Sequence, residues 1–161
     1  MLFSIVLGIL HFMSVLPVIT GQNHPVLRTK TKPVAKVTKE IQKLIRDMHD
    51  TVRAEDGAGL AAPQIGRSER LCLAMISGRM TPLINPVISA RSKEKETEEE
   101  GCLSLPEIVV AVPRHVSITV KYLDAKGKSQ ERRLQDFDAR VVQHEVDHLE
   151  GVLIVDYQTI G

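Results

Sequence analysis

The segment whose residue types and spacing point most clearly to a chemical role is HEVDH at residues 144–148. Two histidines four residues apart lie on one face of a helix, where both imidazoles can bind a single metal ion. Glu145, next to the first histidine, can then reach a water molecule beside that ion and act as a base. A match of this length also occurs by chance on charged surface helices. Here valines and a leucine surround it, which is typical of a core helix in which polar groups need partners. The segment therefore predicts a metal site that includes His144 and His148.

A catalytic metal site that stays open to substrate has three protein ligands, so a third ligand must lie elsewhere in the chain. Only thirteen residues follow His148, and beyond Glu150 their one carboxylate is Asp156. Upstream, Cys102 lies between a glycine and an apolar turn, and a thiolate is a good ligand for iron or zinc. We therefore favour Cys102 as the third ligand. The other cysteine, Cys72, is expected to be a small buried residue within a strand.

A glycine-rich stretch, GAGLAAPQ, occupies residues 57–64. It is not a phosphate-binding loop, because the Lys-Ser/Thr pair that such loops require does not follow it. Glycines allow a backbone to approach a ligand closely, and Gln64 offers an amide donor. We expect residues 56–66 to form a loop with special backbone angles.

The composition is that of a globular protein with one domain. The chain has 161 residues, of which 43% are hydrophobic and 25% charged. Aromatic residues make up only 3%, which argues against proteins that bind nucleic acids by base stacking. A net charge of +1 supplies no field to attract a polyanion. Two cysteines cannot form a disulfide framework, so a reducing compartment is expected.

Hydrophobic periodicity predicts two helices. Residues 39–52 carry apolar side chains at helical spacing, with charged residues between them. Residues 136–151 form the second helix, which contains the HEVDH segment. Asp136 or Asp138 is the candidate N-cap, and Gly151 is a C-terminal stop signal.

Alternating patterns and turn residues predict several short strands. The expected strands are residues 14–20, 71–76, 83–90, 115–122, 131–135 and 152–157. Pro86 makes its strand an edge or a bulge, and a turn at 124–128 indicates an antiparallel hairpin. The charge run at 93–100 is expected to be a solvated loop or strand edge. A helix, antiparallel strands, a helix and a last strand together indicate an α+β domain.

The N-terminus allows two interpretations. Most of the first twenty residues are apolar, close to the ~20 residues that span a bilayer. No lysine or arginine precedes Arg28, so the basic flank of a secretory signal is missing. We interpret residues 1–12 as an apolar extension and residues 13–161 as a single catalytic domain, with a membrane anchor as the alternative.

Three segments together resemble the signature motifs of peptide deformylases, in the same order. They are GAGLAAPQ at 57–64, EGCLS at 100–104 and QHEVDHLEG at 143–151. The resemblance covers the chain from Met13 to Tyr157. It implies an α+β fold in which antiparallel strands pack around a central metal-binding helix. It also implies hydrolysis of the N-formyl group from the N-terminal formyl-methionine of nascent polypeptides, with release of formate.

The resemblance further implies a role for each matching residue. Cys102, His144 and His148 would hold the metal, usually Fe²⁺ in this family and replaceable by Ni²⁺, Co²⁺ or Zn²⁺. Glu145 would be the general base. The Gln64 amide and the Leu103 backbone N–H would bind the oxyanion. The residues expected to contact the substrate are Gly59, through its backbone, and Ala58, Glu100, Phe137 and Val141. Asp147 is expected to pair with a ligand histidine or with an arginine such as Arg114.

Some positions depart from the family pattern. Ala58 stands where the family usually has Ile or Val, and Val109 stands where many bacterial members carry an Arg or Tyr near the peptide. At position 140, the arginine is more similar to the residue of the plant-plastid and related branch than to that of the enterobacterial branch. The chain ends at Gly161 without the long C-terminal helix of enterobacterial members. The expected partners are formyl-methionyl nascent peptides and, transiently, the ribosome, with no direct nucleic-acid contact and no membrane. The expected location is the cytoplasm of a bacterium or of a phage-infected host, with an organelle as the alternative.

Two other functions stay open at this point. A zincin-like metallopeptidase would cleave internal amide bonds and would not depend on Cys102. A catalytically silent relative would bind peptides or the ribosome without a metal. Neither explains why a cysteine, a glutamine and paired histidines occur together.

Overall fold

The computed structural model describes residues 13–159 and has two layers of strands around a central helix. The proposed extension at residues 1–12 lies outside the described residues. The α-helices are α1 (Lys39–Ala54) and α2 (Asp136–Leu149), and the short 3₁₀ helices are η1 (Pro25–Arg28), η2 (Ala62–Ile65) and η3 (Ile154–Thr159). The strands are β1 (Gly59–Ala61), β2 (Leu71–Ile76), β3 (Arg79–Arg91), β4 (Lys95–Cys102), β5 (Leu105–His115), β6 (Ser117–Leu123) and β7 (Ser129–Gln135).

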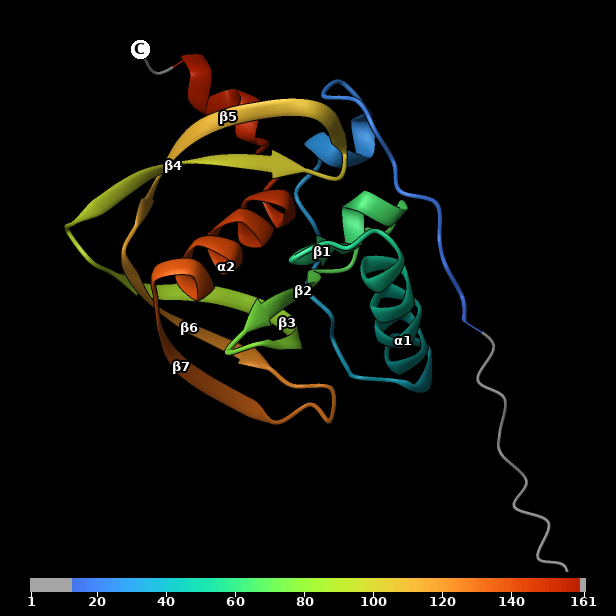
Figure 1. The fold of residues 1–161 in the computed structure, drawn as a ribbon. Helices are drawn as coiled ribbons and strands as arrows, with labels where there is room; N and C mark the ends of the chain where they lie inside the picture. The colour runs from blue at the N-terminus through green and yellow to red at the C-terminus, as the bar shows by residue number, and fades with distance from the viewer. Residues whose placement is uncertain (1–12, 160–161) are drawn as a thin grey trace, which may run out of the picture.

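All strand pairs within the two sheets are antiparallel. Five strands form one sheet in the order β1-β2-β3-β6-β7, and β4 and β5 form a separate pair. Helix α2 runs between the sheet and the β4–β5 pair, whereas α1 lies to the other side of β1 and β2 (Figure 1). The α+β prediction, with strands around a central helix, is confirmed.

Strand β2 separates the two main hydrophobic clusters, which explains its unbroken apolar sequence. Cys72 and Ala74 point into the cluster that contains α2, and Leu71 and Leu73 point into the cluster that contains α1. Successive side chains of a strand face opposite sides. A strand covered on both faces therefore has no position for a polar residue.

Both helices bury the stripes that their sequences predict. In α1, Ile41, Leu44, Met48 and Val52 are buried, and the Thr38 side chain caps the helix by accepting a hydrogen bond from the Ile41 backbone N–H. In α2, the residues in the core are Ala139, Val141, Val142, Val146 and Leu149. Burial of these stripes fixes how far each helix stands from the sheet.

The predicted N-cap of α2 is wrong, whereas its end is as expected. Gln135 precedes the helix and provides no side-chain cap. The Asp138 carboxylate instead accepts a hydrogen bond of 2.9 Å from the backbone N–H of Ser77. Gly151 follows the helix with a φ of 76°, a conformation that glycine adopts without strain.

Two predicted strands do not form, because a side chain binds the backbone of each: from a distant helix in the first case and from the same turn in the second. At 14–20, the backbone N–H of Leu16 donates to the Thr51 hydroxyl of α1, and no strand forms. At 152–157 the chain turns into η3, where the Asp156 carboxylate accepts a hydrogen bond from the Leu153 backbone N–H. A strand ladder would need those backbone donors.

Three other segments differ in detail from expectation. Residues 56–66 contain β1 and η2 rather than a continuous loop. Pro86 lies in a bulge between Ile84 and Val87, and β3 is a central strand, so the bulge is confirmed and the edge position is wrong. The charge run at 93–100 lies largely on β4, an exposed strand whose Glu100 is buried.

Among residues 13–159, no helix has the length and hydrophobicity needed to cross a bilayer. This finding concerns the described residues alone.

Truncation of a side chain in β2 tests the two-sided core. Leu73 is fully buried, so Leu73→Ala leaves a cavity and is expected to lower the free energy of unfolding by about 2–5 kcal/mol. Urea denaturation at fixed metal content measures this change. Val87→Ala is the control, since Val87 is 54% exposed and its truncation is expected to change stability by less than about 0.5 kcal/mol. Equal losses in the two variants would contradict the assigned core.

Candidate metal centre and substrate pocket

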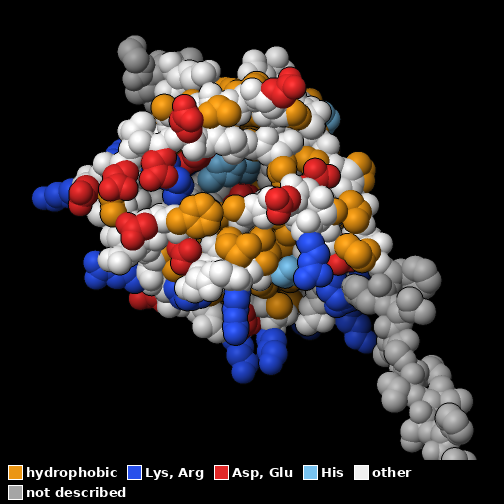
Figure 2. Space-filling model, viewed as in Figure 1, with side chains coloured by type: hydrophobic (Ala, Val, Ile, Leu, Met, Phe, Trp, Pro, Cys, Tyr) orange, Lys and Arg blue, Asp and Glu red, His pale blue; other side chains and the backbone are white. Residues whose placement is uncertain are grey.

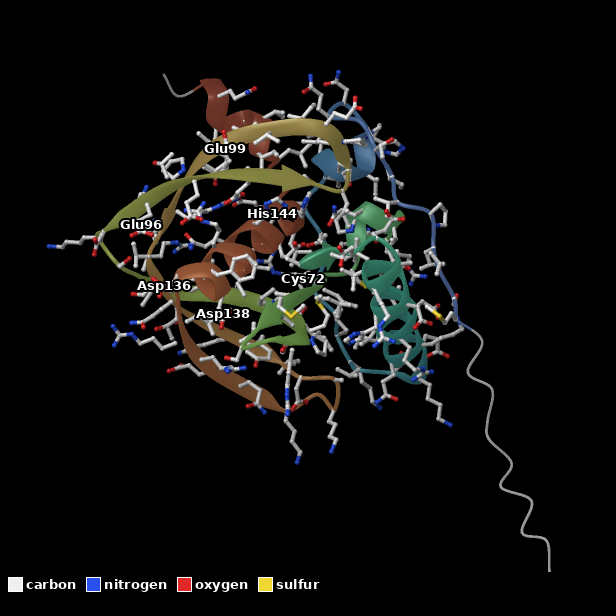
Figure 3. The ribbon with its side chains drawn as sticks, in the orientation of Figure 1. Cys72, Glu96, Glu99, Asp136, Asp138 and His144 are labelled. Carbon is white, nitrogen blue, oxygen red and sulfur yellow. The ribbon has the colours of Figure 1, made fainter. Side chains whose placement is uncertain are left out.

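Three soft or borderline donors from two elements meet at one point. Cys102 ends β4, and His144 and His148 lie one turn apart on α2. One ligand atom from each of the three residues lies within 4.8 Å of the other two. The Cys102 Sγ is 3.3 Å from His148 Nε2. In Figure 3, His144 lies where α2 faces the β4–β5 pair, whereas Cys72 lies on the five-stranded sheet.

A sharp turn between β4 and β5 brings the cysteine to the helix. Cys102 pairs with Leu105, so only two residues separate the paired positions. This turn aims the Cys102 thiol at α2, although 42 or more positions separate it from the histidines in the sequence. Cys72, by contrast, is fully buried within β2, and burial raises the pKa of its thiol. The prediction that Cys72 is a core residue is confirmed.

Glu100 fixes the orientation of the first histidine. Its Oε2 lies 2.9 Å from His144 Nδ1, which leaves Nε2 of that ring for a metal. The two histidine rings pack edge to face, with centroids 5.0 Å apart. His148 is 1% exposed, and its Nδ1 has no hydrogen-bond partner in the described part of the chain.

Two arginines hold the Glu100 carboxylate in place. Arg114 donates to both carboxylate oxygens at 2.9 Å, and Arg140 donates to Oε1 at 2.8 Å. Burial alone would raise the pKa of Glu100, but the hydrogen bonds from Arg114 and His144 outweigh it and hold this pKa far below its usual range. The carboxylate was expected to contact substrate. Both of its oxygens accept hydrogen bonds from these partners, which compensate its buried charge, and its contact with substrate stays a prediction.

The same cluster extends to the C-terminal segment. Arg114 also pairs with Asp147, as expected from the sequence, and donates a hydrogen bond of 3.0 Å to the Tyr157 hydroxyl. Tyr157 in turn donates to Asp147 at 2.7 Å. Burial, together with the Asp147 charge, raises the pKa of Tyr157 to about 12. These contacts attach η3 to α2 and β5.

The two histidines have opposite proton affinities in the metal-free protein. Burial by itself favours the neutral form of both imidazoles and so acts to lower their pKa values. For His144, hydrogen bonds with Cys102 and Glu100 outweigh burial and raise the pKa to about 10. For His148, burial and the nearby His144 charge keep the pKa well below its usual value. A metal that binds here must displace the His144 proton, whereas His148 is already neutral.

Gln64 directs its amide toward the cysteine. Its Oε1 accepts a hydrogen bond of 2.9 Å from the Ala61 backbone N–H, which leaves the NH₂ group facing the site. Nε2 lies 3.7 Å from the Cys102 Sγ and 3.2 Å from the Ser104 hydroxyl. Ser104 is buried and belongs to the EGCLS motif, but its hydroxyl carries no spacing signal that could have identified it.

Glu145 is a buried carboxylate with an unused oxygen. It is 4% exposed, and its Oε2 has no hydrogen-bond partner among residues 13–159. Burial is the main cause that raises its pKa to about 7, since the attraction of His144 and Arg114 only partly offsets it. A carboxylate with this pKa can take up and return a proton near neutral pH.

One cavity of about 540 Å³ joins these groups. Every residue assigned a site role from sequence lines it, except His148, which lies behind the others. Figure 2 shows the hollow, with a pale-blue histidine at its floor and orange and red side chains around it. Phe137 is 56% exposed at the mouth, and Ala58 and Val141 contribute apolar surface. Leu103 lies beside Cys102 on the same wall.

The β4–β5 pair adds wall residues to the cavity: Glu107 and Ile108, which sequence reasoning did not assign, and Val109, a position that the resemblance placed near the peptide. The register jumps at Glu100, which pairs with Val110, so residues 106–109 bulge over the cavity. Ile108 and Val109 line the cavity there and are exposed, and Glu107 has a φ of 64°. A bulge cannot be located from alternation, because the alternating pattern continues on both sides of it.

Comparison with known proteins identifies the family of this chain. A family model described as polypeptide deformylase matches residues 16–159. The peptide deformylase of Pseudothermotoga lettingae is 49% identical over 132 residues, which cover 82% of this chain and 77% of that protein. Peptide deformylase 1 of Rickettsia conorii is 43% identical over 155 residues, covering 90% of this chain and 88% of that protein.

Solved structures agree as well. The crystal structure of peptide deformylase from Thermotoga maritima superposes with a TM-score of 0.86 at 43% identity, covering 91% of this chain and 98% of that one. The Acinetobacter baumannii enzyme with bound Met-Ala-Ser gives a TM-score of 0.86 at 35% identity, covering 90% and 99% of the two chains. These matches favour neither the zincin-like peptidase nor the silent relative. The chain belongs to the peptide deformylase family, metalloenzymes that hydrolyse the N-formyl amide of nascent peptides.

Proposed function

We propose that this chain binds its catalytic metal through Cys102, His144 and His148, and that the metal in the cell is Fe²⁺. The observation that supports this most directly is the convergence of one sulfur and two imidazole nitrogens within 4.8 Å. A thiolate with two imidazoles suits iron, zinc, nickel and cobalt. Three protein ligands leave a position open, as a catalytic site requires.

The residues around the donors fit a metal as well. Glu100 supports the His144 ring through Nδ1, in the way that carboxylates support ligand histidines. The buried Glu145 Oε2 has no hydrogen-bond partner within residues 13–159, as expected of a group that binds a water molecule in the working enzyme. A divalent ion in this site supplies Lewis acidity, which activates water for attack at neutral pH.

Glu145 is the general base in this proposal. It would take a proton from the attacking water and return it to the amine that leaves. Its pKa of about 7 in the metal-free protein suits both steps, since a base works best when its pKa is near the working pH. Because the Glu145 side chain is buried, bulk water does not compete for its carboxylate oxygens.

Gln64 and the Leu103 backbone N–H would stabilise the negative charge on the formyl oxygen. The Gln64 amide is held by the Ala61 backbone and needs no rearrangement to donate. A donor fixed in advance contributes most to the transition state, and loss of one typically costs ~10²–10³ in rate.

The cavity would hold the methionine side chain of a formyl-methionyl peptide. Ala58, Phe137 and Val141 offer apolar surface to a thioether, and the Gly59 backbone would align the peptide. The tripeptide Met-Ala-Ser bound in the A. baumannii enzyme supports this reading. We further propose that the protein acts in the bacterial cytoplasm, meets the ribosome transiently, and uses residues 13–161 as one catalytic domain. The bacterial sources of its relatives support this location.

Formate release from formyl-Met-Ala-Ser by anaerobically purified protein tests this assignment. Glu145→Gln keeps the shape of the side chain but removes the base, so we expect its turnover to fall by ~10²–10⁴. Metal analysis of both proteins is the control, because the variant should keep its ion. Unchanged turnover in Glu145→Gln would show that another group is the base. No release by wild-type protein with bound metal would overturn the substrate assignment.

Replacement of the cysteine tests the ligand set. Cys102→Ser exchanges a thiolate for a weakly acidic hydroxyl, so we expect metal affinity to fall by at least about tenfold. Competition with a chelator, followed by metal analysis, measures this. Cys72→Ala is the matched control, since Cys72 lies in the core and should leave metal retention unchanged. Equal retention in both variants would exclude Cys102 as a ligand.

A further inference from the structure

Gly59 occupies a strand position where its backbone does not require glycine. It lies in β1 and pairs with Ala74 of β2 in a regular antiparallel register. Its φ lies outside the left-handed region, so any residue could adopt this conformation. Glycine weakens a strand interior, and in such a position it marks a close approach of another group.

The group that approaches Gly59 is the side chain of Glu145. A Cβ atom at Gly59 would lie 2.3 Å from Glu145 Oε1, 2.7 Å from its Cδ and 2.9 Å from its Cγ. Ordinary van der Waals contact begins at 3.4 Å. The space that a methyl group would fill at this position is therefore already taken by the Glu145 carboxylate.

We propose that Gly59 is a positioning residue for this reaction, because its missing side chain creates the space that sets where the Glu145 carboxylate lies. The inference rests on the proposed role of Glu145 as the base. It differs from the docking role suggested for the Gly59 backbone, since a peptide can bind the backbone of any residue.

If a methyl group is added at Gly59, the Glu145 carboxylate can move in only one direction. Val142, Val146 and Leu149 pack α2 onto the five-stranded sheet, so the helix cannot withdraw without opening the core. Glu145 and Gly59 both line the substrate cavity, which is the adjacent free space. A methyl group at Gly59 therefore pushes the carboxylate into the cavity, while the fold and the metal donors stay in place.

Gly59→Ala is the direct test, with formate release, metal content and a crystal structure as readouts. The carboxylate must move by roughly 1 Å, and a misplacement of that size can cost about 10²-fold in rate. We expect kcat to fall by about that factor, KM to stay within about threefold, and the metal to be retained. A rise in KM at unchanged kcat, or a carboxylate that stays in place, would overturn the proposal.

Combining Gly59→Ala with a shorter side chain at Glu145 separates crowding of Glu145 from other effects of the added methyl group. Glu145→Ala removes all three side-chain atoms that the added methyl would meet, and its residual formate release then serves as the reference. In this background Gly59→Ala is expected to change kcat by less than about threefold, which is strong non-additivity. If Gly59→Ala alone proves insoluble, the double variant should fold, because the same contact is removed. A double variant that stays insoluble, or additive losses in kcat, would refute the inference.

Gly101→Ala provides the matched control for the loss of a glycine near the site. A Cβ atom there would meet no atom within 4 Å. The readout of this control is the position of Glu145: a Glu145 carboxylate displaced to the same extent in a crystal structure of Gly101→Ala would show that the contact with Gly59 is not the cause. The assignment of Glu145 is tested separately by Glu145→Gln. If that variant keeps its activity, the base assignment fails; if it loses activity and Gly59→Ala does not, only the positioning role fails.

Discussion

The arrangement of the site depends on one buried carboxylate. Glu100 of β4 binds Arg114 of β5 and both Arg140 and His144 of α2, so a single negative charge joins all three elements. Removal of one partner from a buried ion pair typically costs about 3–5 kcal/mol, because the remaining charge is left without compensation. The β4–β5 pair can therefore dock on α2 in only one way, and that docking brings Cys102 to the histidines.

This constraint explains why the metal donors can come from distant parts of the chain. The two histidines are placed by helical geometry alone, whereas the Cys102 thiol depends on a turn, a register and the contact between two sheets. Two positive side chains surround Glu100, and Arg114 also binds Asp147 and Tyr157. Charge compensation is thus shared over a network rather than left to one pair, which keeps the ligand ring of His144 from rotating.

The sequence predicted those parts of the fold that local patterns determine. Helix α1, helix α2 and strand β2 bury apolar residues at regular spacing, and the grouped motifs identified the residues around the cavity. Residues 14–20 and 152–157 both have strand-like patterns. At 14–20 the Thr51 side chain of α1 binds the backbone, and no local pattern contains that information. At 152–157 the Asp156 side chain binds the backbone of its own turn, and the apolar alternation around it outweighed that local signal. Glu100 was expected to contact substrate, but its ion pairs with Arg114 and Arg140 were not predicted, because only the folded chain brings these charges together.

Two buried glutamates close to the same histidine differ in what their surroundings do to them. Glu100 faces two arginines and His144, which hold its pKa far below the usual range. Glu145 lies in the same interior, its Oε2 has no hydrogen-bond partner within the described part of the chain, and burial raises its pKa to about 7. Pairs of acids whose surroundings separate their pKa values in this way divide structural and proton-transfer roles. Glu100, whose pKa is lowered, can support a ligand as a carboxylate, and Glu145, whose pKa lies near neutral pH, can move a proton. The different roles of Glu100 and Glu145 follow from how many arginines pair with each carboxylate rather than from residue type, because both residues are glutamates.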